Sequence, residues 1–294
     1  MISTVDREAR HTRKGKSQRR DGFRGHVAAE PGTGLITDCE MTMAAGEGSG
    51  DAENGVKMAA RDRFGDDAAG ARGAAGTPAQ DVTGPAVTDP AGAQESTGLR
   101  DIAQPTRAED DGGLEIYGDS AYGSGEARAA YRDAGHDTMI KPKPLQPAVP
   151  GGLTLDDFAV NEDEGTVTCP AGHTRPMSKS RTVTFGTLCA RCPLRQRCTT
   201  AKDGRSMTIH PHEGLLRAAR AQARTDDFKK AYPTRSAIER IISWTATCNG
   251  RRIRLRYLGT AKNNAWLHTR CAAINLRTLL RHGLTRRDGA WILA

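Results

Sequence analysis

A carboxylate placed just after a short apolar stretch is the first feature of this sequence that could do chemistry. Residues 114–117 read LEIY and are an expected strand, which Gly118, Asp119 and Ser120 follow directly. Folds of the α/β type commonly place functional side chains on the loop that follows a strand. The structural alternative is that Asp119 caps a helix expected over residues 126–134, and these residues alone favour that alternative.

A second candidate carboxylate lies on a helix expected over residues 226–246. Tyr232, Arg235 and Glu239 recur at i, i+3 and i+7, so they share one stripe of that helix. The neighbouring isoleucines supply its apolar face, and Glu239 is expected close to the buried side. A salt bridge between Arg235 and Glu239 within the helix is the alternative, and the spacing alone favours it.

Four cysteines have the spacing of a metal site. Cys189 and Cys192 form a CxxC pair, Cys198 follows six residues later, and Cys169 precedes them. A CxxC turn presents two thiolates for tetrahedral Zn²⁺, and two more distant cysteines can complete the site. His173 could replace one thiolate. The alternative is a set of ordinary buried cysteines, but the paired spacing favours a structural zinc ion.

Two other polar motifs are assigned no catalytic role. His210 and His212 stand just before an expected helix and fit a turn that begins it. Asp156 and Asp157, like the acidic run at residues 162–164, lie on expected turns, where most such pairs are solvated.

The C-terminal part of the sequence is strongly basic. Between Glu239 and Asp288 it contains no carboxylate. Cations without counter-charges indicate a surface that contacts a phosphate backbone, because ordinary surfaces intersperse the two signs. The five residues assigned to DNA binding are Arg251, Arg252, Arg254, Arg256 and Lys262. Five more cations of the same basic surface follow at Arg270, Arg277, Arg281, Arg286 and Arg287.

The composition agrees with a polyanionic partner. The 294 residues carry a net charge of +8. No apolar run approaches the ~20 residues that a membrane helix needs, and the basic N-terminus lacks the apolar core of a secretory signal. The seven cysteines are mostly clustered, which favours reduced thiols or metal ligands. We therefore expect a cytoplasmic, nucleoid-associated protein with no membrane partner.

The order of the expected elements indicates an α/β fold. Strands are expected at residues 23–30, 34–42, 114–117 and 136–141, and a helix at 51–63, in addition to the helices already named and others after residue 213. This order suggests a mixed sheet flanked by helices, and the ribonuclease-H-like fold is one member of that class.

Composition divides the chain into five segments. Residues 65–113 consist mainly of Ala, Gly, Asp, Pro and Thr, and we expect them to be a disordered insertion. Residues 1–64 and 114–152 are assigned to the catalytic domain, residues 153–212 to a cysteine-rich zinc-binding insertion, and residues 213–294 to the late helices and the basic tail.

With these pieces in order, the chain resembles the DDE transposases of bacterial insertion sequences. It is most similar to the group that carries a cysteine-rich insertion before the last catalytic helix. The resemblance covers most of the chain outside residues 65–113, and the collinear order of its blocks is more specific than any one of them. The blocks are TVDREARH, DGFRGHVAAEPGTGLIT, GDSAYGSGEARAA, HDTMIKPKPLQPAVPGG, CPAG…CARCPLRQRC, Y-x2-R-x3-E and AKNNAWLHTRCAAINLRTLL.

The resemblance implies specific roles for several residues. Asp119 matches the second catalytic aspartate of the family and Glu239 its catalytic glutamate, while Tyr232 and Arg235 match the residues that accompany that glutamate. The implied chemistry is DNA cleavage and strand transfer at element ends and target. It uses two Mg²⁺ ions held by about three carboxylates, in a complex that contains a homodimer.

The sequence departs from the family pattern in two places. The lysine that often follows the glutamate by seven residues is replaced by Ala246. The first catalytic aspartate is expected on a strand upstream of this sequence, and the sole candidate near that place is Asp6, which matches a block that follows the strand. We therefore expect a truncated transposase. The alternative is an inactive remnant that binds only DNA or zinc.

Overall fold

A computed structural model describes residues 5–14, 18–61 and 113–293, and all of these except Gly113 belong to one compact unit. The segment expected to be disordered, residues 65–113, lies outside the described residues except for Gly113. Among the helices of the described part, none has both the length and the apolar character needed to cross a membrane.

The N-terminal sheet consists of three antiparallel strands, whose order in the sheet is the same as their order along the chain. They are β1 (Arg10–Lys14), β2 (Gln18–Ala29) and β3 (Ile36–Met43). β1 pairs with the first part of β2, and β3 pairs with residues 23–29 on its other edge. The two strands expected from the sequence are thus confirmed as β2 and β3, whereas β1 was not predicted.

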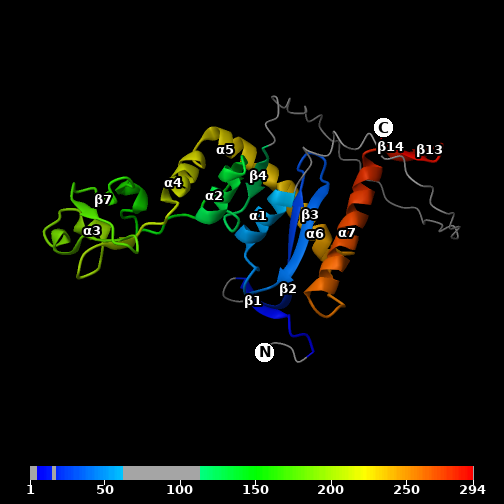
Figure 1. Cartoon of the computed structure of the whole chain (residues 1–294), viewed down its shortest axis with the longest axis horizontal. Coiled ribbons are helices and arrows are strands. Elements are labelled where there is room, and N and C mark those ends of the chain that lie inside the picture. Colours follow the sequence, from blue (N-terminus) through cyan, green and yellow to red (C-terminus); the bar gives the residue numbers. More distant parts are fainter. Residues whose placement is uncertain (1–4, 15–17, 62–112, 294) are drawn as a thin grey trace. The chain divides into compact units, whose positions relative to one another are not determined.

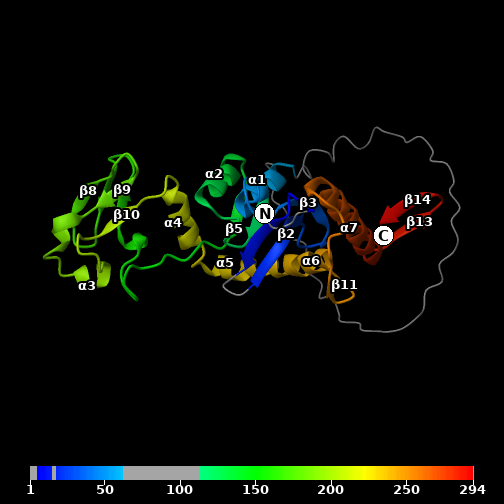
Figure 2. The same ribbon diagram turned by 90° about the horizontal axis from the view of Figure 1, so that it is seen from below.

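Helix α7 (Thr260–Arg281) packs against β3 (Figure 1). Its buried residues Leu267, Cys271 and Ile274 recur at the spacing of one helix face and meet Cys39 and Met41 of the sheet. Helix α6 (Ser236–Ala246) adds Ile241 to this core and packs on β2 and α7 (Figure 2).

Two asparagines of α7 also form hydrogen bonds with backbone groups of β3. Asn264 Oδ1 accepts the Met41 N–H at 2.8 Å, and Asn275 exchanges two hydrogen bonds with the backbone of Ile36, at 2.8 and 2.7 Å. Side-chain amides therefore satisfy donors and an acceptor that an edge strand leaves open.

A parallel strand pair carries the first candidate carboxylate. β4 (Glu115–Gly118) and β5 (Asp137–Ile140) are joined through α2 (Gly125–Asp133), as predicted. α2 packs against α1 (Asp51–Arg61), the predicted helix that follows β3. In the described residues this pair is not hydrogen-bonded to the β1–β2–β3 sheet, so the single mixed sheet that we expected is present as separate small sheets.

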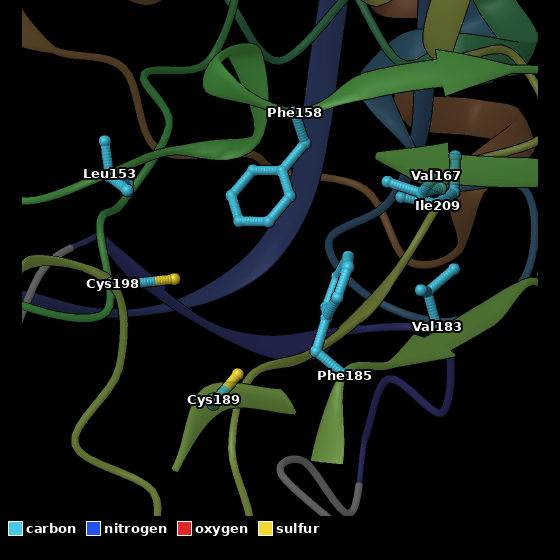
Figure 3. Packing of buried hydrophobic residues seen from close by; sticks show 8 residues of the cluster. All are labelled: Leu153, Phe158, Val167, Val183, Phe185, Cys189, Cys198 and Ile209. Carbon is cyan, nitrogen blue, oxygen red and sulfur yellow. The ribbon is translucent and has the colours of Figure 1, made fainter. Parts of the chain in front are cut away.

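The cysteine-rich segment forms its own small core. Phe158, Val167, Val183 and Ile209 are buried together, and the rings of Phe158 and Phe185 lie 5.8 Å apart (Figure 3). Its elements are η1 (Leu155–Asp157), β6 (Ala159–Asn161), β7 (Thr166–Thr168), β8 (Thr174–Pro176), β9 (Thr182–Thr184), η2 (Gly186–Cys189), α3 (Arg195–Cys198) and β10 (Ser206–Thr208). β6, β7 and β8 form one sheet, and β9 and β10 form another.

The helix expected over residues 226–246 is divided into three pieces. These are α5 (Asp226–Ala231), the 3₁₀ turn η3 (Tyr232–Arg235) and α6. The expectation of one continuous helix was wrong because Pro233 has no N–H to donate and its ring crowds the preceding turn. The remaining elements are α4 (Glu213–Gln222), β11 (Thr247–Cys248), β12 (Arg251–Arg252), β13 (Leu284–Arg287) and β14 (Ala290–Leu293).

A buried ion-pair network fastens α4 to the start of the cysteine-rich segment. Arg220 Nη2 donates to Asp156 Oδ1 at 2.7 Å and also pairs with Glu213, while Arg217 donates to backbone carbonyls of η1. The Asp156 side chain is 20% exposed. The expectation that Asp156 is a solvated turn residue was therefore wrong, because its partner Arg220 lies on a helix 64 residues away in the chain.

Candidate functional site

Asp119 lies exposed in the turn that follows β4. One carboxylate oxygen accepts the backbone N–H of Ala121 at 2.8 Å, and the Asp119 carbonyl accepts the N–H of Tyr122. The cap of α2 is instead Ser124, whose hydroxyl accepts the N–H of Ala127 at 3.2 Å. The structural alternative for Asp119, a helix cap, is thus excluded.

The ring of Tyr122 lies near Asp119 and near a second carboxylate, Asp51, which is paired with Arg24. Burial raises the pKa of the Tyr122 phenol, and the charges of Asp51 and Asp119 raise it further. Both carboxylates therefore lie near this ring, although Asp51 begins α1 and Asp119 follows β4.

Sequence reasoning gave no role to His26, which lies beside Asp51. His26 on β2 is 1% exposed, and its Nδ1 lies 3.6 Å from Asp51 Oδ1 without a hydrogen-bond partner among the described residues. Burial lowers the pKa of His26, and the charge of Asp51 opposes this. No sequence signal distinguished His26 from an ordinary core histidine, because its partner comes from another element.

Glu239 is paired with Arg235 but remains exposed. Arg235 Nη2 donates to Glu239 Oε1 at 2.8 Å, and 61% of the Glu239 side chain is exposed. The expectation that Glu239 lies near the buried side of its helix was wrong. The buried residue Ile241 lies two positions further along, about 200° around the helix axis.

Tyr232 forms an aromatic platform for the same arginine. Its ring stacks on Phe228 with centroids 5.0 Å apart, and the Arg235 guanidinium lies 5.5 Å from the Tyr232 centroid. Because Tyr232 and Arg235 both lie on η3, the contact between them holds Arg235 at the start of α6, one turn before Glu239.

The chain segments that precede Asp119 and Glu239 pack against each other. η3, which leads into the helix of Glu239, packs against β4, which leads into Asp119. Segments more than a hundred residues apart in the sequence are thus brought side by side.

Asp6 lies at a different place, beside the first turn of α7. Its Oδ2 accepts the backbone N–H of Gly259 at 3.1 Å, and its Oδ1 accepts the N–H of Glu8 at 3.0 Å. In residues 5–14, 18–61 and 113–293, no group of three or more His, Cys, Asp or Glu side chains is gathered closely enough to hold a metal ion. The structure therefore does not bring Asp6, Asp119 and Glu239 together as a ready-made triad.

The four clustered cysteines line one small cavity. Cys189 and Cys198 are buried and their sulfur atoms point into the core of the segment (Figure 3), while Cys169 and Cys192 are half-buried. The cavity has a volume of about 20 Å³, room for one water-sized particle. His173 lines the same cavity.

The chemistry of this donor set fits a soft cation. Burial raises the pKa of the Cys198 thiol; Arg205 lowers it, and the other three thiols raise it further. The backbone N–H of Arg205 also donates to Cys189 Sγ at 3.4 Å, the kind of outer contact that orients a ligand sulfur. The four thiols have the composition of a Cys₄ site, but they are not gathered as ligands.

The five cations expected to bind DNA are all exposed. Arg251 and Arg252 form β12, and Arg254 and Arg256 follow it in an extended loop, while Lys262 lies in the first turns of α7. None of the five forms an ion pair with another described residue. Their positive charge is therefore open to a polyanion.

Three of the more distant arginines have structural partners. Arg270 donates to the carbonyls of Trp244 and Thr245 at 2.7 and 2.9 Å, so it satisfies the end of α6. Arg277 and Arg281 lie 4.8 and 5.8 Å from the centroid of the Trp244 indole. The expectation that the whole run forms one phosphate-binding surface was thus wrong for Arg270.

Comparison with known families gives one match. The family model described as Transposase DDE domain matches residues 168–280, which include the four cysteines and Glu239 but neither Asp6 nor Asp119. The chain matches no curated protein and no solved structure. The matched range is less than half of the chain, and it supports a DDE transposase that acts in DNA transposition and recombination.

Proposed function

We propose that this chain is a transposase that cleaves DNA and transfers the cleaved strand, with Asp119 and Glu239 as metal-binding catalytic residues. Two observations support this: the transposase family match contains Glu239, and η3 packs against β4. The second carries the proposal, because a helix cap and a local salt bridge would not require these two segments to meet.

The exposed carboxylates suit a hard cation. One oxygen of Asp119 is hydrogen-bonded to Ala121 and one oxygen of Glu239 to Arg235. Both residues could approach Mg²⁺, which supplies Lewis-acid activation of the attacking oxygen and stabilises the leaving oxygen in phosphoryl transfer. Arg235, held against the Tyr232 ring, would neutralise charge on the scissile phosphate.

We further propose that the separate small sheets belong to a ribonuclease-H-like arrangement. The antiparallel β2–β3 pair, helix α1 and the parallel β4–α2–β5 unit follow in that order along the chain. The cysteine-rich segment would add a structural Zn²⁺ held by Cys169, Cys189, Cys192 and Cys198. Two copies of the chain would act together on the DNA.

The test is DNA cleavage by the purified full chain. Duplex fragments from the DNA that flanks its gene are incubated with Mg²⁺ or Mn²⁺, and cleaved and joined strands are measured. Asp119→Asn and Glu239→Gln should each reduce cleavage below detection while DNA affinity stays within twofold, since a metal ligand acts mainly on the transition state. Asp133→Asn, an exposed acid at the end of α2, is the matched control.

A second function is favoured by the position of Asp6. Because both of its oxygens accept backbone hydrogen bonds near α7, Asp6 does not complete a group of three metal ligands in the part of the chain that the structure describes. On this alternative the chain binds DNA without cleaving it. Wild-type protein that binds the flanking fragments but cleaves none of them, with either metal ion, would establish this alternative.

A further inference from the structure

The last described element is a two-stranded ribbon. β13 and β14 pair antiparallel, with Leu284 opposite Leu293 and Arg286 opposite Trp291. Asp288 and Gly289 form the turn, with φ of 49° and 81°. Positive φ at both central positions is what a type I′ hairpin turn requires, and Asp-Gly is a preferred pair there.

The ribbon exposes apolar side chains on both faces. Trp291 is 62% exposed, Ile292 44% and Leu293 56%. Because directly paired residues share a face, Arg286 and Trp291 lie together on one side of the ribbon and Ile292 lies on the other. A two-stranded hairpin with both faces in water is only marginally stable. The ribbon therefore has the properties of a contact surface.

The charge of the ribbon indicates what it contacts. Arg286 and Arg287 form no ion pair with another described residue, and Asp288 is the sole carboxylate of the ribbon. A second copy of the ribbon brings the same net positive charge and repels the first. A polyanion removes that repulsion and gains from both cations.

We propose that the β13–β14 ribbon enters a groove of duplex DNA. The major groove admits a two-stranded β-ribbon. Arg286 and Arg287 contact phosphates, and Trp291 packs against the sugars and base edges of the groove. This inference rests on the proposed function in so far as DNA is the substrate, and it adds a contact separate from the arginines of β12 and the following loop.

The test uses Trp291 as its own reporter. The full chain has three tryptophans, so the Trp244→Phe/Trp266→Phe variant leaves Trp291 alone. We expect a saturating 25-base-pair duplex to reduce acrylamide quenching of Trp291 at least about twofold. The further change Arg286→Glu/Arg287→Glu should remove this protection. It should also reduce the magnitude of the negative slope of log K against log salt by about 1.8, at about 0.9 per phosphate contact.

A matched double reversal controls for net charge. Lys179→Glu/Lys202→Glu changes two exposed lysines of the cysteine-rich segment and should leave the protection of Trp291 intact. If the double phenylalanine variant does not fold, Trp291→Ala in the otherwise native chain provides a second measure, with an expected loss of DNA affinity of at least fivefold.

Three other results would contradict a role of the ribbon in DNA binding. DNA that binds while Trp291 stays equally quenched overturns the inference and leaves the proposed function standing. A chain that binds no DNA overturns both. Protection that appears without DNA and grows with protein concentration assigns the ribbon to contacts between copies of the chain, and so overturns its role in DNA binding.

Discussion

The Asp6 carboxylate accepts a hydrogen bond from the backbone N–H of Gly259, 3.1 Å away and 253 positions along the chain. Gly259 is the N-cap residue of α7 and has no side chain to cap the helix. Asp6 and Glu8 provide the missing acceptors, because Glu8 Oε2 accepts the next N–H, that of Thr260, at 2.6 Å. Two acidic residues that are distant in the sequence thus cap the N-terminus of α7.

We expect Asp6→Ala to destabilise the protein by about 1 kcal/mol, as the loss of a helix cap does. The reason is that the Gly259 N–H loses its acceptor. Urea unfolding measures this change, and DNA cleavage should fall no more than stability explains. A normal unfolding curve combined with complete loss of cleavage would instead place Asp6 among the catalytic carboxylates.

The first turn of α7 should also depend on pH through Glu8. Hydrogen bonds from Thr260 lower the pKa of Glu8 from its ordinary value of 4.5. A lowered folded-state pKa means that the stabilisation is fully present above pH 4.5 and is lost as pH falls through the folded-state value. Hydrogen exchange of the Thr260 amide should therefore accelerate relative to its intrinsic rate below pH 4.5. In Glu8→Gln this step should be absent.

The ion pair between Asp156 and Arg220 should matter more than a surface pair. Burial opposes ionisation of Asp156, but the hydrogen bonds and charge of Arg220 outweigh it and lower the pKa. Asp156→Asn leaves the buried guanidinium with Glu213 as its remaining carboxylate partner, and we expect a loss of about 3 kcal/mol. Chemical unfolding of this variant should be compared with Asp163→Asn, an exposed acid of the same segment, which should change stability by less than about 0.5 kcal/mol.

Local patterns in the sequence were sufficient to predict the longer strands and helices, but not the individual short elements of the cysteine-rich segment. The turn around Gly34, where φ is 74°, separated two strands correctly, and the apolar periodicity of α7 was recognised. The terminal ribbon was missed because its Asp-Gly turn follows two arginines and precedes a continuous apolar run, so neither side alternates apolar and polar residues. β1 was missed because its sequence, RHTRK, is polar throughout.

The site was harder to predict because its geometry depends on contacts between distant elements. Spacing alone predicted the pairing of Arg235 with Glu239, four residues apart in a helical segment. It could not predict that Asp156 meets Arg220, that Arg270 turns inward to α6, or that His26 faces Asp51. Each of these contacts joins residues from different elements, and no local period encodes them.

The cysteine cavity should bind one zinc ion per chain. We expect about one equivalent of Zn²⁺ by metal analysis, with the Cys189→Ser/Cys192→Ser variant losing both the metal and the local fold, because such sites couple metal binding to folding. Zn²⁺ affinity should rise with pH, since burial raises the pKa of Cys198 and the thiol must release its proton to bind.

An exposed cysteine outside the cavity provides the control. Cys248 lies on β11 and is exposed, so Cys248→Ser should retain the full zinc content. Protein that is free of zinc and yet has the same unfolding midpoint as the zinc-loaded sample would contradict the prediction.

DNA affinity should depend steeply on salt through the arginines of β12 and the loop after it. Replacing Arg251, Arg252, Arg254 and Arg256 by alanine should reduce the slope of log K against log salt by up to about 3.6, at about 0.9 per phosphate contact. The loss should be similar for unrelated duplex sequences, because phosphate contacts carry no base specificity. Arg270→Ala is the informative comparison, since that side chain donates to backbone carbonyls of α6. It should lower the unfolding midpoint while leaving the salt slope unchanged. An unchanged slope in the fourfold variant would place the phosphate contacts on another surface.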